Sequence, residues 1–259
     1  MRRGVRELSA FYATAMGRAA RRLIERKIVE AWDSARELDV LGLGYATPYL
    51  AAFRASARRT VAAMPQAQGV EPWPAGEPDL ACLGEELRLP FPNALFDRVL
   101  VIHGLEEADD PAAYMAEVRR VMSPSGRMIC AVANRRGFWA GSESTPFGHG
   151  RPFTRSQLEA VVREAGLEPT AWSRALYAPP LPALSPWAEG LEQAGSRLWT
   201  PLSGVILLEA VKQTFAVRPK GSRAPVFAPG RLQPRPAAVA NNTPNTTRSR
   251  QNSPDGRKP

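Results

Sequence analysis

Two glycines, Gly42 and Gly44, stand at the end of a short apolar run, and a helical pattern begins at Pro48. Glycine adopts dihedral angles that other residues avoid, and it places no Cβ between backbone and ligand. A strand that turns into a helix through such residues directs backbone N–H groups, here those around Leu43 and Tyr45, at whatever binds there. This suits a nucleotide-like ligand at the carboxyl edge of a parallel sheet. A tight strand–helix turn without a ligand is the structural alternative, because a lone glycine pair is a weak signal.

Other residues that could do chemistry follow later apolar runs. Glu85 and Glu86 are either ligands or a solvated loop end, and His103 is either a base or a packed residue at a strand end. The segment 134–153 is long, rich in aromatic residues and without a helical pattern, which is typical of a functional loop. It holds a last group of candidates, which either bind an anionic acceptor, acidic or phosphorylated, or rim the domain: Arg135, Arg136, His149 and Arg151.

The elements that must position these residues alternate between strands and helices. Period-3.6 stripes and caps predict helices over 7–32, 48–57, 111–122, 154–165 and 186–198. Apolar runs predict strands ending near Gly42 and over 59–64, 80–83, 96–103, 127–132, 171–177 and 204–215. Prolines and glycines in 65–78 favour a loop where a crossover helix would stand. The sum is an α/β fold: a doubly wound, mostly parallel seven-stranded sheet with an antiparallel edge strand.

The net charge of +9 belongs almost entirely to the end of the chain. Residues 218–259 carry nine Lys/Arg and one acid, so the preceding residues are close to neutral. Eight prolines and few large apolar side chains predict that 218–259 is a disordered basic tail. We therefore expect one domain over 1–217, and the charge argues against nucleic-acid binding by that domain. The arginines on the 7–32 helix are most simply a solvated face.

Cysteine use and hydropathy indicate the compartment. Cys82 and Cys130 are far apart, which argues against a disulfide framework or a zinc site and fits a reducing compartment. No apolar run approaches the roughly 20 residues that span a bilayer. An export signal is also not evident, so we expect a cytoplasmic protein without a membrane partner.

Dinucleotide binding is disfavoured, because Thr47 replaces the third small residue of the G-x-G-x-x-G pattern and no acid follows about 20 residues on. Taken together, the motifs of residues 8–215 resemble the class I S-adenosylmethionine-dependent methyltransferases of the type 11 group. The matching segments are Leu41–Ala46, Glu85–Phe91, Phe96–Val99 with His103, and Glu117–Gly126. The resemblance implies S-adenosylmethionine as cofactor and makes cofactor contacts of Gly42, Leu43, Gly44, Tyr45, Glu85, Glu86, Leu87 and His103, with Glu85 favoured for the adenine amino group.

The chain departs from the family pattern at three positions. Val40 stands where the family has an acid, Ala46 replaces the third glycine, and Met64-Pro65-Gln66 stands where an acid would bind the ribose hydroxyls. An unmade hydrogen bond to the ribose weakens binding by about 1–3 kcal/mol. Gln66, or Glu71 if the loop folds back, could compensate in part.

The resemblance implies methyl transfer to an unidentified acceptor, with a small molecule as the expected class. This chemistry needs alignment and exclusion of water more than a catalytic constellation. His103 and His149 are the candidates for a base where the acceptor is protonated. The departures support the alternative of a methyltransferase-like binding or regulatory module without turnover. Neither the acceptor nor the oligomeric state follows from the sequence.

Overall fold

The computed structural model describes residues 3–212 of the 259-residue chain. The basic tail predicted over 218–259 and the last residues of the strand predicted over 204–215 lie outside the described residues. The domain boundary at 217 therefore stays a prediction.

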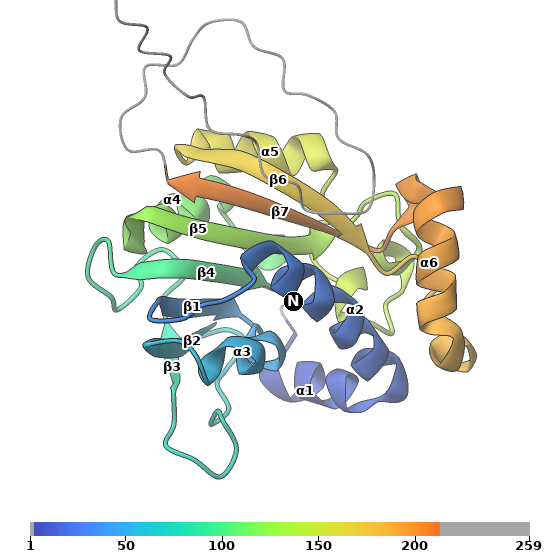
Figure 1. Ribbon diagram of the computed structural model, residues 1–259, viewed down its shortest axis with the longest axis horizontal. Helices are drawn as coiled ribbons and strands as arrows, with labels where there is room; N and C mark the ends of the chain where they lie inside the picture. The colour runs from blue at the N-terminus through green and yellow to red at the C-terminus, as the bar shows by residue number, and fades with distance from the viewer. Residues whose placement is uncertain (1–2, 213–259) are drawn as a thin grey trace, which may run out of the picture.

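Within the described residues, seven strands form one sheet in the order β3-β2-β1-β4-β5-β7-β6 (Figure 1). The strands are β1 (Asp39–Gly44), β2 (Arg59–Pro65), β3 (Ala81–Gly84), β4 (Phe96–Ile102), β5 (Met122–Ala133), β6 (Leu167–Ala175) and β7 (Val205–Lys212). β1 to β5 pair in parallel, whereas β7 is antiparallel to both β5 and β6. All six residues of β1 are buried, as expected of a central strand covered on both faces. The predicted fold class is confirmed, and the antiparallel strand is β7, one position in from the edge.

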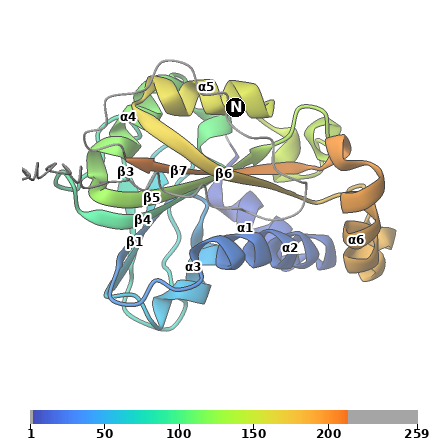
Figure 2. The same ribbon diagram turned by 45° about the horizontal axis from the view of Figure 1, so that its top comes forward.

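Helices cover both faces of this sheet (Figure 2). α1 (Val5–Ala13), α2 (Ala15–Trp32) and α3 (Thr47–Arg54) pack on one face, and α4 (Pro111–Val121) and α5 (Arg155–Glu164) on the other. α6 (Ala188–Leu198) stands beside α2 at one end of the sheet. Short 3₁₀ helices occur at η1 (Leu105–Glu107), η2 (Phe138–Gly141), η3 (Pro146–Gly148), η4 (Pro182–Trp187) and η5 (Thr200–Leu202). No helix within 3–212 is long and apolar enough to cross a membrane.

The single helix predicted over 7–32 is wrong, because the chain breaks at Thr14. The Thr14 side chain accepts a hydrogen bond from the Gly17 N–H at 2.9 Å and caps α2, while its own N–H ends α1 on the Phe11 carbonyl. A Cβ on Gly17 would collide with that carbonyl, so glycine lets α1 fold back onto α2. The apolar stripe continues through the break since both helices bury a face, which is why periodicity alone did not reveal it.

The packing of β1 at its carboxyl end can be tested by substitution of Gly44. Its φ is +76°, and an added Cβ would collide with the Ile102 carbonyl oxygen on β4. We expect Gly44→Ala to lower the free energy of unfolding by roughly 3 kcal/mol, from backbone strain plus the collision. Urea unfolding followed by tryptophan fluorescence measures this.

Gly76→Ala is the matched control, because Gly76 has a φ of +74° and open space around its Cβ position. Its substitution should remove only about 1 kcal/mol, the strain of the left-handed backbone. Equal losses in the two variants would show that the approach of β4 does not matter.

Candidate functional site

The turn after β1 is built by close backbone packing. A Cβ on Gly42 would lie 2.6 Å from Cδ1 of Leu50 on α3, so Gly42 lets that helix approach the strand. Gly44 packs against the end of β4, and the Tyr45 N–H donates to the Ile102 carbonyl at 2.8 Å. Both glycines are thus required by the strand–helix turn itself, and the Tyr45 amide is already paired. The glycine pair alone therefore does not establish a ligand site.

A small hollow lies at the carboxyl ends of β1, β2 and β3. It has room for about one water molecule, and its walls include Leu43, Gly44, Met64, Glu86, Leu89 and Tyr114. Glu86 is half-buried and lines the hollow, whereas Glu85 and Leu87 are exposed and do not. Flat apolar walls with one carboxylate suit a heterocycle that carries an amino group. The structure thus places Glu86, rather than the favoured Glu85, where an adenine contact would be made.

A buried amide side chain follows the end of β2, where the sequence lacks the acid of the family pattern. Gln68, three residues beyond the strand, is 3% exposed, and neither polar atom of its side chain has a hydrogen-bond partner in the described structure. Buried polar atoms without partners cost free energy, which points to a ligand or water that would satisfy them. Gln66 is exposed, but Glu71 does fold back, since its carboxylate accepts the Tyr45 hydroxyl at 2.7 Å. Asp39, the acid nearest the motif, instead pairs with Arg58 at the other end of β1, at 2.6 Å.

Tyrosines and one histidine cover the turn after β1. The Tyr12 ring of α1 stacks on Tyr45, with centroids 5.7 Å apart, and its hydroxyl lies 2.9 Å from that of Tyr49 and 2.8 Å from Nε2 of His103. The network is satisfied when Tyr49 donates to Tyr12 and Tyr12 donates to His103. Burial raises the pKa of Tyr12 well above its ordinary value. The Tyr12 side chain is therefore uncharged, and it covers the turn after β1.

His103 is buried in this cluster. Burial, followed by the nearby Arg3, lowers its pKa to about 3, so its imidazole is neutral at physiological pH. A base with so low a pKa accepts protons poorly near pH 7. The other candidate, His149, contacts Arg3 at 2.6 Å and the Glu143 carbonyl at 2.8 Å. The low pKa of His103 makes it a poor general base, and Nε2 of His149 is engaged by Arg3 and the Glu143 carbonyl.

The four candidate substrate residues do not form one cluster. Arg135 is exposed and donates to the Pro152 carbonyl at 3.0 Å, and the backbone N–H of Arg151 donates to the Glu106 carbonyl. Arg136 lines a separate groove with Arg155 and Arg174. An anion that contacts Arg136 would thus meet arginines that the sequence analysis did not group with it.

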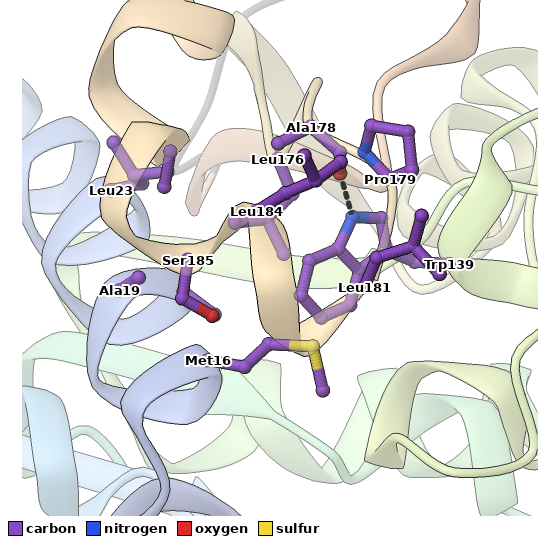
Figure 3. Close-up of a pocket in the computed structure, with 12 residues that line it drawn as sticks. Met16, Ala19, Leu23, Trp139, Leu176, Ala178, Pro179, Leu181, Leu184 and Ser185 are labelled. Carbon is purple, nitrogen blue, oxygen red and sulfur yellow. Dashed lines mark hydrogen bonds between the residues drawn. The ribbon is translucent and has the colours of Figure 1, made fainter.

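An apolar space lies between α2 and the segment that joins β6 to α6 (Figure 3). Its walls include Met16, Leu23, Leu181 and Leu184. The Trp139 indole N–H is used by the Ala178 carbonyl at 2.7 Å, and the Ser185 hydroxyl is buried without a partner in the described structure. This space is narrow, with a volume of about 20 Å³; its lining is apolar and offers no catalytic residue.

Comparisons with known proteins agree with this architecture. Residues 38–130 match the family model of the type 11 methyltransferase domain. The ubiquinone/menaquinone biosynthesis C-methyltransferase UbiE of Caulobacter vibrioides is 36% identical over 61 residues, which is 23% of this chain and 24% of that protein. The chain thus matches about a quarter of the length of such curated relatives. The resemblance to the type 11 group is confirmed for the segment that carries the β1 turn and Glu86.

Solved structures show the same fold. An S-adenosylmethionine-dependent methyltransferase of Thermotoga maritima, described as a possible histamine N-methyltransferase, superposes with a TM-score of 0.56 at 16% identity, over 81% of this chain and 96% of that one. An S-adenosylmethionine-dependent methyltransferase of Mesorhizobium loti gives 0.52 at 13% identity, over 78% and 100% of the two chains. At these identities the likeness establishes the fold of class I methyltransferases and no more.

The buried His103 predicts a specific loss of stability in acid. Its pKa of about 3 in the folded chain lies below its ordinary value of 6.5, so the unfolded state binds the proton more readily at intermediate pH. The stabilisation is complete above pH 6.5 and is lost as the pH falls towards 3. Between pH 7 and pH 5 the free energy of unfolding should fall by roughly 2 kcal/mol from this residue.

Urea unfolding at both pH values, with wild type and His103→Asn, isolates the effect. Asparagine tolerates the φ of +52° at this position and does not titrate. The variant should lose the extra acid sensitivity. An unchanged difference between pH 7 and pH 5 would contradict a neutral, buried His103.

Proposed function

We propose that this chain is an S-adenosylmethionine-dependent methyltransferase that acts on a small-molecule acceptor. The observation that carries the proposal is the hollow bounded by β1, β2 and β3, whose apolar walls and single carboxylate match an adenine. It lies within the segment that matches the methyltransferase domain. The cysteine use favours a cytoplasmic location.

The residues at the hollow fit an adenosyl group. Leu43, Leu89 and Tyr114 would flank the base, and Glu86 would accept hydrogen bonds from its amino group. The Gln68 amide, whose nitrogen and oxygen are both without partners in the described residues, would bind the ribose hydroxyls in place of the missing acid once the neighbouring side chains move. When bound, S-adenosylmethionine supplies a methyl group already activated by its sulfonium.

The protein's own task is to align the acceptor and exclude water. Tyr12, His103 and Phe147 form a buried aromatic roof over the turn, with His103 and Phe147 centroids 4.7 Å apart. The hollow has room for about one water molecule, far less than the roughly 300–1,000 Å³ of most ligand sites. Binding of the donor therefore requires the side chains around the hollow to move apart.

The acceptor is assigned here only as a small molecule. The apolar space beside Trp139 would take an apolar part of it. The quinone pathway named for UbiE is not transferred, because the match covers a quarter of that protein and 23% of this chain.

A degenerate module that binds without turnover is the second candidate. It is favoured by Val40 and Ala46 in the motif and by the stacking of Tyr12 on Tyr45, which closes the turn. Its distinguishing property is weak or absent binding of the methyl donor.

Calorimetry with S-adenosylmethionine and S-adenosylhomocysteine separates the two candidates. We expect micromolar binding of both. Glu86→Gln should weaken the binding of S-adenosylhomocysteine by about tenfold, which is the contribution of one hydrogen bond to a charged group.

Glu85→Gln is the matched control, because Glu85 is adjacent, exposed and outside the hollow. The affinity of the Glu85→Gln variant for S-adenosylhomocysteine should stay within about twofold of wild type. Silence at millimolar ligand would favour the degenerate module, and equal losses in both variants would remove Glu86 from the adenine contact.

A further inference from the structure

An open groove lies between the end of β5, β6, the start of β7 and the N-terminus of α5. It has a volume of about 390 Å³, and its walls include Asn134, Arg136, Thr154, Arg155 and Arg174. This groove is distinct from the hollow at β1–β3, and the two share no lining residue.

The position of Arg136 in this groove is set by a buried asparagine. Asn134 is 4% exposed, and its side-chain amide donates to the carbonyls of Pro201 and Ser203 at 3.0 and 2.7 Å. Its Oδ1 accepts the Arg136 N–H at 3.2 Å. The backbone that presents Arg136 is therefore fixed to the segment before β7.

The charges in the groove are unbalanced. Three arginines face one acid, Glu159, which gives a formal net charge of +2. Glu159 already bonds Arg155 at 2.6 Å and Arg163 at 3.1 Å. Within residues 3–212, neither Arg136 nor Arg174 makes an ion pair.

Arg174 is the arginine of the groove whose pKa this excess of positive charge affects. It is half-buried, one guanidinium N–H donates to the Thr200 carbonyl at 2.9 Å, and its Nε is buried without a partner in the described residues. Burial lowers its pKa first, Tyr177 opposes this, and Arg155 and Arg136 lower the pKa further. An anion in the groove would relieve the repulsion among these arginines.

Two of the three guanidiniums in the groove lie beside an aromatic ring. Those of Arg155 and Arg174 lie 4.2 and 4.8 Å from the ring centroid of Trp172 on β6. Such contacts orient an arginine without consuming its N–H donors. Side chains ordered in advance lose less entropy on binding.

The start of α5 adds backbone donors. In the capping box, the Thr154 N–H donates to the Gln157 side chain at 3.0 Å, and the Gln157 N–H donates to the Thr154 hydroxyl at 3.3 Å. The amides of Arg155 and Ser156, the first two of the helix, have no acceptor within it. A helix N-terminus with free amides stabilises a bound anion.

We propose that this groove is a binding site for a phosphate group, held by Arg136 and Arg174 with the first amides of α5. A phosphate near −2 matches the groove charge, and its several oxygens match arginine forks and amides together. The site does not depend on methyl transfer. That the phosphate belongs to the methyl acceptor is a further step, which rests on the proposed function.

Calorimetry on the full chain, at pH 7.5 and constant ionic strength, tests the site. We expect inorganic phosphate or phenyl phosphate to bind with a low-millimolar or smaller Kd, and acetate and benzoate at least tenfold more weakly. Tighter binding of phenyl phosphate identifies an organic monoester, and equal affinity identifies free phosphate as the ligand. Failure of S-adenosylhomocysteine to bind the same sample would affect the proposed function only.

Matched arginine variants decide where the phosphate lies. Arg136→Gln should weaken phosphate binding at least tenfold. Arg174→Gln, whose folding is checked by circular dichroism, should weaken it by a similar factor. Arg135→Gln removes the same charge one residue away, outside the groove, and should change affinity less than twofold. No phosphate binding below about 20 mM, or equal losses in the Arg135 and Arg136 variants, would overturn the proposal.

Discussion

The approach of β1 to the end of β4 is the constraint on which the site depends. Gly44 has no Cβ, so the strand can bring its last residue against the Ile102 carbonyl, and the following amide of Tyr45 pairs with the same oxygen. That contact fixes where Tyr45 leaves the sheet and where α3 begins. It also sets His103, one residue beyond Ile102, beneath the same turn. Four aromatic or histidine rings then share one buried volume at the carboxyl edge.

Burial of that cluster decides its chemistry. Desolvation disfavours charge on every member, so Tyr12 stays protonated and His103 stays unprotonated. A cluster that avoids charge is poorly suited to proton transfer but well suited to keeping water from a reactive sulfonium. The aromatic covering over the turn is thus separate from the polar side chains that we propose as ligand contacts, Glu86 after β3 and Gln68 after β2.

The sequence predicted the sheet well because buried parallel strands are unmistakable apolar runs, and the loop at 65–78 because proline and glycine exclude a helix. It predicted the site less completely. Tyr12 and Tyr114 lie on helical stripes, where a tyrosine is ordinarily core, so nothing in the spacing distinguished them. Glu85 and Glu86 are neighbours on an irregular turn, and only backbone geometry decides which one faces inward. Thr14 did carry a signal, since threonine three residues before glycine can cap a helix, but the continuous stripe concealed it.

The positions of the acidic residues distinguish the arginines of the groove from arginines elsewhere in the described chain. Three buried or partly buried acids elsewhere in residues 3–212 are paired with arginines: Asp39 with Arg58, Glu117 with Arg120, and Glu209 with Arg127. Such pairs remove the repulsion that accompanies burial of like charges. In the groove, neither the exposed Arg136 nor the half-buried Arg174 has an acidic partner within residues 3–212. Asn134 holds the Arg136 backbone, and the Trp172 ring lies beside the Arg174 guanidinium. The groove therefore keeps a formal net charge of +2 next to a helix N-terminus, and this excess is the reason that we propose an anion as its ligand.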